Sequence, residues 1–99
     1  MASTLINDYE VMYSANTFPP RIWLMNSGKF IGQLIFQPNG TVLPPDSLVS
    51  GQAQIHYHLD DFANCASILR NEKTVYMVYN GSGPGNENGL MTSQLLTGT

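Results

Sequence analysis

The segment from Gln52 to Leu59 alternates between polar and apolar residues, and this alternation constrains the fold more than any other feature of the chain. In a strand, successive side chains point to opposite faces. One face would carry Ala53, Ile55, Tyr57 and Leu59, and the other would carry Gln52, Gln54, His56 and His58. The pattern therefore predicts a half-buried strand with both histidines on its wetter face.

A helical pattern follows this strand directly. Apolar residues recur at the spacing i, i+3, i+4 and i+7, and they are Phe62, Cys65, Ala66 and Leu69. We expect a helix over residues 61–71, with Asp60 or Asp61 as its N-cap and Arg70 in its last turn. Thr74 to Tyr79 then predicts a strand that is apolar on both faces. The dimensions of this strand–helix–strand segment allow a right-handed crossover within one sheet.

The remaining strands are expected from shorter patterns. Two apolar runs separated by Asn26–Lys29 predict a hairpin. In its second run, simple alternation places Phe30 with Gly32 on one face and Ile31 on the other. The other expected elements are a strand over 9–13, a proline-containing connection over 41–51, a glycine-rich loop over 80–89 and a short strand over 90–93.

These elements predict the α+β class: a mixed or mainly antiparallel sheet of four to six strands, with a single amphipathic helix (about residues 61–71) packed on one face. The 99 residues suit a single domain, 1–99, in which residues 1–7 and 94–99 are expected to be mobile ends.

The low charge of the chain favours association. Charged residues make up 11% of it, against about 25% in a typical domain. One helix cannot cover both faces of a wide sheet, so we expect a homo-oligomer in which a second copy covers the other face. The candidate interface or pocket residues are Trp23, Met25, Ile31, Ile35, Tyr76 and Val78.

The charge pattern also argues against some partners. The net charge is −3, and the four basic residues are scattered along the chain. Phosphate groups need several basic residues on one face, so we expect neither nucleic-acid nor membrane binding. The N-terminal residues lack a basic segment followed by an apolar run, and no apolar stretch approaches the roughly 20 residues of a membrane span. These features predict a cytoplasmic location.

The stretch from His56 to Asp61 is the one cluster with metal-binding chemistry. His56, His58 and Asp60 share strand parity, and imidazole with carboxylate suits zinc or non-haem iron. The stretch partly resembles the His-x-His-x-Asp-His signature of the metallo-β-lactamase superfamily. Its last histidine is replaced by Asp61 and the chain has no third histidine, so we exclude that family.

Two functions therefore stay open at this stage. The first is a small soluble binding or assembly module, homo-oligomeric, with no cofactor and no evident catalytic machinery. The alternative is a small metal-dependent or acid–base enzyme that uses His56, His58 and Asp60. A small-molecule ligand in an apolar pocket is a third hypothesis, but no motif names that ligand.

Overall fold

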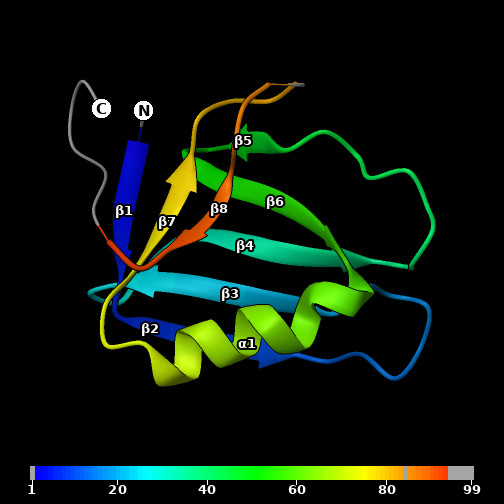
Figure 1. The fold of residues 1–99 in the computed structure, drawn as a ribbon, viewed down its shortest axis with the longest axis horizontal. Coiled ribbons are helices and arrows are strands. Elements are labelled where there is room, and N and C mark those ends of the chain that lie inside the picture. Colours follow the sequence, from blue (N-terminus) through cyan, green and yellow to red (C-terminus); the bar gives the residue numbers. More distant parts are fainter. Residues whose placement is uncertain (1, 84, 94–99) are drawn as a thin grey trace.

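The computed structural model describes residues 2–83 and 85–93, which form two β-sheets and one α-helix (Figure 1). The five-stranded sheet has the order β2-β3-β4-β6-β5, and the three-stranded sheet has the order β1-β7-β8. The strands are β1 (Ala2–Ile6), β2 (Asp8–Met12), β3 (Arg21–Asn26), β4 (Lys29–Gln37), β5 (Ser47–Val49), β6 (Gln52–His58), β7 (Val75–Tyr79) and β8 (Gly89–Met91). A 3-10 turn, η1 (Leu59–Asp61), leads into α1 (Phe62–Asn71). The α+β class is confirmed, with the strands divided between two sheets.

The predicted hairpin forms the centre of the five-stranded sheet. Ser27 and Gly28 connect β3 to β4 with φ angles of 52° and 81°. Two successive positive φ angles define the tight turn whose twist matches that of paired strands, and glycine adopts such an angle without strain. The β4–β6 pair is parallel and the other pairs are antiparallel, so the sheet is mixed, as predicted.

A β-bulge changes which side chains of β4 face the core. Leu24 pairs with Gly32 and Met25 pairs with Phe30, so Ile31 is an extra residue on β4. Such a residue interrupts the alternation of faces. Phe30 consequently joins the face of Met25, while Ile31 is 9% exposed and belongs to the core. The expected pairing of Phe30 with the face of Gly32 was therefore wrong.

A second hairpin lies inside the segment expected to be a plain connection. Ser50 and Gly51, with φ angles of 52° and 80°, join β5 to β6. Since β4 and β5 occupy both edges of β6, β7 has no free edge of β6 to pair with. The crossover within one sheet, which the dimensions of the segment allowed, therefore does not form.

The N-terminal segment supplies the partner that β7 needs. Ala2–Ile6 pairs antiparallel with β7, and Ile6 is buried in the core. These residues, expected as part of a mobile end, form the edge strand that satisfies the ladder hydrogen bonds of β7 on that side. The expectation for residues 94–99 lies outside the described residues.

The core lies between two layers. Helix α1 and the three-stranded sheet both lie on the same side of the five-stranded sheet (Figure 1). The helix contributes Cys65 and Leu69 to this core, and it packs on one face of the sheet as predicted. The radius of gyration is 13.0 Å, which matches about 13 Å expected for one domain of this size.

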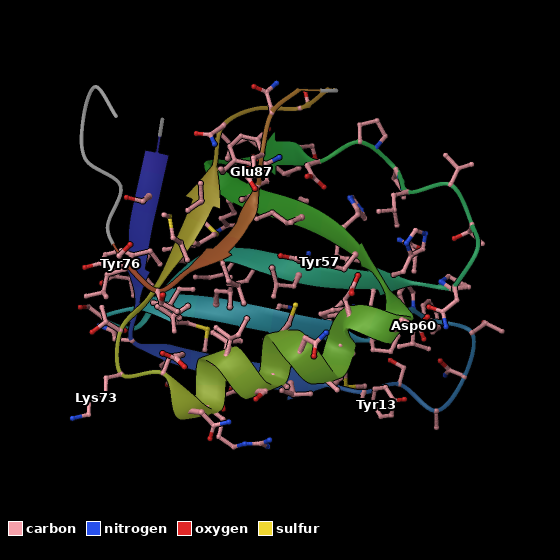
Figure 2. All side chains as sticks on the ribbon, in the orientation of Figure 1. Tyr13, Tyr57, Asp60, Lys73, Tyr76 and Glu87 are labelled. Atoms are coloured by element: carbon pink, nitrogen blue, oxygen red, sulfur yellow. The ribbon has the colours of Figure 1, made fainter. Side chains whose placement is uncertain are left out.

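The start of α1 lies at one of the two predicted N-cap residues. Asp61 occupies the capping position, but its side chain makes no capping hydrogen bond, and η1 supplies the preceding turn instead. Asp60 is engaged elsewhere, since its carboxylate accepts a hydrogen bond from Asn39 at 2.9 Å. Tyr13 lies beside the start of the helix, with its ring centroid 5.0 Å from that of Phe62 (Figure 2).

Candidate functional site

The face of the five-stranded sheet turned away from α1 is called the outer face here. A row of hydrogen-bonded side chains crosses it. Trp23 Nε1 donates to Gln33 Oε1 at 3.1 Å, and Gln33 Nε2 donates to Gln54 Oε1 at 2.5 Å. This row joins β3, β4 and β6, so polar groups of the outer face satisfy one another within the chain.

A shallow hollow of about 480 Å³ lies on the outer face beside this row. Trp23, Met25 and Phe30 form its apolar lining, and the acidic residues Asp8 and Glu10 line it from β2. This surface is apolar at its centre and acidic along one side, a composition that suits contact with another protein.

Arg21 lies on β3, at the end of the β2–β3 pair that is opposite to Asp8. Its guanidinium carbon is 5.6 Å from the centre of the Trp23 ring, which is a cation–π distance. Within the described residues, Arg21 Nε is buried without a hydrogen-bond partner. The outer face therefore carries negative charge at one end and positive charge at the other.

The predicted interface residues fall in three places. Trp23, Met25 and Ile35 belong to the outer face, where all three are half-buried. Ile31 belongs to the core because of the bulge, and so it lines no surface. The last two, Tyr76 and Val78, lie on β7 in the three-stranded sheet.

The predicted metal residues have separate partners. His56 Nδ1 is 3.4 Å from Asp46 Oδ1. His58 Nε2 donates to the carbonyl oxygen of Thr41 at 2.6 Å, and Asp60 exchanges two hydrogen bonds with Asn39. No group of three His, Cys, Asp or Glu residues within 2–83 and 85–93 is arranged to hold a metal ion. The metal site stays a prediction that no observation supports.

His56 is less exposed than the alternation suggested. Its side chain is 11% exposed, and together with Leu43, Pro44 and Pro45 it lines a cleft. The carboxylate that approaches it belongs to Asp46, not to Asp60 as the sequence suggested. No motif marks Asp46, since it follows two prolines in a connection; only its approach to β6 in space reveals the contact.

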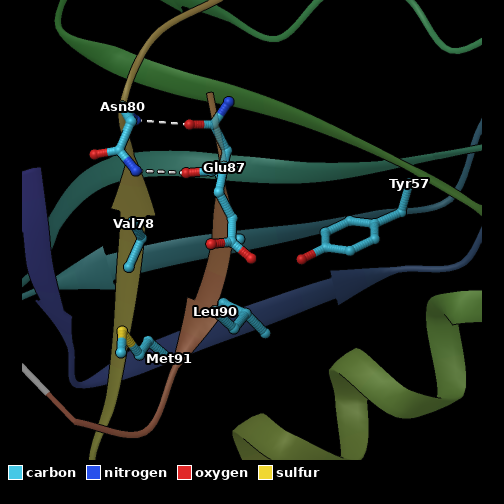
Figure 3. A pocket seen from close by; sticks show the side chains of 8 residues that line it. Tyr57, Val78, Asn80, Glu87, Leu90 and Met91 are labelled. Atoms are coloured by element: carbon cyan, nitrogen blue, oxygen red, sulfur yellow. Dashed lines mark hydrogen bonds between the residues drawn. The ribbon is translucent and has the colours of Figure 1, made fainter. Parts of the chain in front are cut away.

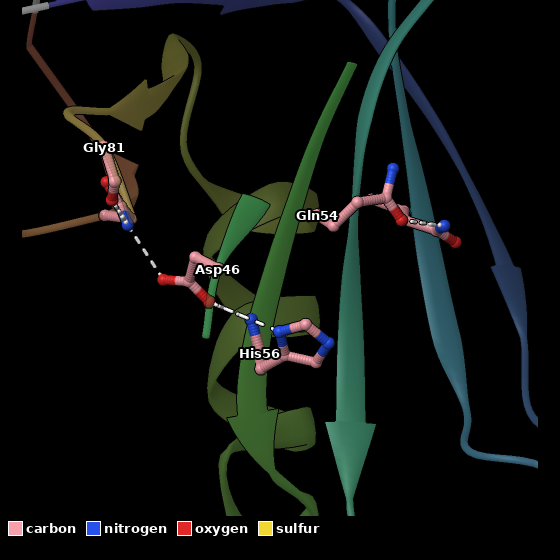
Figure 4. Close-up of polar contacts among 6 residues, drawn as sticks. Asp46, Gln54, His56 and Gly81 are labelled. Carbon is pink, nitrogen blue, oxygen red and sulfur yellow. Dashed lines mark hydrogen bonds and ion pairs between the residues drawn. The ribbon is translucent and has the colours of Figure 1, made fainter. Parts of the chain in front are cut away.

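Asp46 joins three segments that are distant in the sequence (Figure 4). Its Oδ1 accepts the backbone N–H of His56 at 2.8 Å, and its Oδ2 accepts from Asn88 Nδ2 at 2.8 Å. Asn88 also donates to the carbonyl of Gly81 at 2.9 Å and accepts the backbone N–H of Asn80. This network anchors the loop between β7 and β8 against β6.

A cleft of about 340 Å³ opens beside that network, between β6 and the β7–β8 hairpin (Figure 3). Tyr57 lines it from β6, and Glu87 lines it from the loop. Burial raises the pKa of Tyr57, with smaller contributions from Cys65, Asp61 and Asp46, so its hydroxyl stays neutral. Burial also raises the pKa of the neighbouring Cys65 thiol to about 11.

Comparison of the chain with protein-family models, with curated proteins and with solved structures found no match. No helix in the described part of the chain is both long and apolar enough to cross a membrane.

Proposed function

We propose that this protein is a small self-associating module without catalytic chemistry, and that its outer face contacts a second copy of the chain. The observation that carries the proposal is the apolar lining of the outer face by Trp23, Met25 and Phe30. Both described elements that cover the sheet, α1 and the three-stranded sheet, lie on the opposite side (Figure 1). Aromatic residues and Met are enriched at protein interfaces.

The polar groups of the outer face favour burial against another protein. Burying a polar group costs free energy when it loses its hydrogen bonds with water and gains none. The Trp23 indole already donates to Gln33, and Gln33 already donates to Gln54. A partner can therefore cover this row without leaving those donors unpaired.

As a flat area, the outer face is smaller than a standard protein–protein contact. Its five strands have between 3 and 9 residues, and at about 3.3 Å per residue and about 4.8 Å between strands they give roughly 480 Å². A standard interface buries about 800 Å² on each partner. The side chains that project from the sheet make its accessible surface area larger than this flat area.

The charges of the outer face suit a two-fold arrangement. Asp8 and Glu10 lie opposite Met25 and Trp23 in the β2–β3 pair, whereas Arg21 lies at the other end of it. A two-fold axis across the strands would bring the acidic end of one copy to the basic end of the other. Two-fold dimers are the commonest assemblies of identical chains.

Sedimentation velocity between 1 and 100 µM tests the proposal. We expect a dimer for the natural chain, a monomer for Ile35→Lys on the outer face, and a dimer for the matched control Val42→Lys. Val42 is 95% exposed in the connection after β4, so a lysine is tolerated there. Circular dichroism confirms that each variant is folded.

The single tryptophan provides a readout that needs no variant. Since Trp23 lies in the proposed contact, its emission should shift to longer wavelength as the protein is diluted and the copies separate. A natural chain that is monomeric across the whole range, with unchanged Trp23 emission, would refute the proposal.

The alternative, a metal-dependent or acid–base enzyme using His56, His58 and Asp60, stays a prediction. Its test is metal analysis of the purified protein and melting temperature with added zinc, nickel or iron. No bound metal, no shift in melting temperature, and no change when both histidines are replaced by Ala would remove its basis.

A further inference from the structure

The cleft between β6 and the β7–β8 hairpin has the construction of a small-ligand site. Val78, Leu90 and Met91 give it an apolar side, while Tyr57 and Glu87 provide polar groups (Figure 3). Ligand sites commonly combine a mostly apolar lining with a few polar groups, and start at about 300 Å³. The volume of about 340 Å³ suits a compact ligand.

The charge that the described lining residues bring to the cleft is negative. Glu87 is the one charged residue among the described residues that line it. Asp46 and Asp61 act electrostatically on Tyr57, and no basic group is among the charges that do so. The chain as a whole carries a net charge of −3. A cationic ligand is therefore favoured over an anionic one.

The Tyr57 hydroxyl provides a hydrogen-bond acceptor in this cleft. A phenolic oxygen carries lone pairs that can accept a hydrogen bond from a donor. A Cβ at position 89 would lie 2.6 Å from this hydroxyl oxygen, so the glycine at that position leaves room for it. In Figure 3 the hydroxyl of Tyr57 points toward the loop segment that carries Glu87, just before β8.

We infer that this cleft binds an alkylammonium group. The Glu87 carboxylate and the Tyr57 hydroxyl oxygen accept hydrogen bonds from the ammonium, and the alkyl chain lies against Leu90 and Met91. An ammonium group has three donors and no acceptor, which matches two converging acceptors. Since no outer-face residue lines the cleft, this binding is independent of the proposed self-association.

NMR titration of the labelled full chain tests the inference with three probes of one shape: butylammonium, butanol and butyrate. Butylammonium should shift the backbone amides of Gly89 and Leu90 in a saturable way, and the other two should not. Butanol measures the binding that apolar contact alone produces. Butyrate shows whether a negatively charged head group binds as well. Equal binding of butanol, or no saturable shift by butylammonium up to 50 mM, would overturn the inference.

Two variants with the same net charge test whether Glu87 itself contacts the ammonium. Glu87→Gln should weaken butylammonium binding about three- to tenfold, because it removes the carboxylate and keeps the side-chain shape. Glu72→Gln removes a charge at the end of α1, outside the cleft, and should leave the affinity unchanged. Equal loss of affinity in both variants would show only a response to net charge and would overturn the assignment.

The source of the ammonium is decided by a further comparison. Nα-acetyl-lysine methylamide represents a lysine side chain of a protein, and butylammonium represents a free amine. Tighter binding of the lysine derivative supports a peptide source, and tighter binding of butylammonium supports a free amine. Binding of either probe that depends on Glu87 supports the inferred chemistry.

Discussion

Gly32 lies where β4 of the five-stranded sheet closely approaches β7 of the three-stranded sheet, and replacing it with Ala should destabilise the protein. Gly32 lies opposite Ala53 in the parallel β4–β6 pair. A Cβ at position 32 would lie 2.7 Å from Met77 Sδ and 2.8 Å from the carbonyl oxygen of Ala53. Met77 belongs to β7 of the other sheet, so an added methyl group meets both a strand neighbour and the opposite layer.

The expected magnitude follows from two opposing effects. Overpacking a well-packed core costs about 1–3 kcal/mol. Replacing glycine with Ala, at a position where the backbone accepts it, stabilises the protein by about 0.4–1 kcal/mol because the unfolded chain has less conformational entropy. We expect Gly32→Ala to lower the free energy of unfolding by about 1–2 kcal/mol. In a domain of this size each kcal/mol lowers the melting temperature by about 4–8 °C.

Urea unfolding monitored by circular dichroism measures this change, and Met77→Ala provides the mechanistic test. With Met77 truncated, one of the two close contacts is gone, so the cost of Gly32→Ala should fall. Gly40→Ala is the matched control. Position 40 has no atom within 4 Å but has a φ of +81°, so its cost of about 1–2 kcal/mol reflects backbone strain and should not depend on Met77. Unchanged or increased stability of Gly32→Ala would refute the close approach of the layers.

Further predictions concern the cleft and its neighbouring network. The Cys65 thiol, with its pKa raised to about 11, should resist a thiol reagent at pH 8 until urea is added, and rapid labelling of the folded protein would contradict its burial. Because that pKa exceeds the ordinary value of 9.0, the stability that the protonated thiol contributes is present below pH 9 and is lost as the pH rises toward about 11. The fall in urea stability over this range should be smaller in Cys65→Ala. Asn88→Ala should lower the free energy of unfolding by about 1–3 kcal/mol, because Asp46 Oδ2 and the backbone N–H of Asn80 lose their hydrogen-bond partner. Asn86→Ala in the same loop should change the free energy of unfolding little. Equal effects of the two substitutions would argue against the network.

Local patterns were sufficient to predict the elements that depend on near neighbours. The alternation across Gln52–Leu59 predicted β6 and the burial of Ala53 and Ile55. The helical spacing predicted α1, with Cys65 and Leu69 buried. Turn residues predicted the β3–β4 hairpin, and Ser50-Gly51 was a comparable signal that could have revealed β5.

The candidate site was only partly accessible from the sequence. Trp23 and Met25 were predicted as surface contacts, and they line a hollow of the outer face. Asp46 and Glu87 were missed, since each is an isolated acidic residue in a loop and no spacing connects either with His56 or Tyr57. Their importance comes from distances between segments that are far apart in the chain.

The sequence by itself determined the secondary structure of most segments and the α+β class, because periodicity and turn chemistry act over a few residues. Tertiary structure decided which strands became neighbours. With both edges of β6 occupied, β7 paired with the N-terminal segment and divided the strands into two sheets. The bulge at Ile31 then decided that Phe30 would join Trp23 and Met25 on the outer face. Pairing depends on which edges remain free after the other strands have assembled, and a local pattern carries no record of that competition.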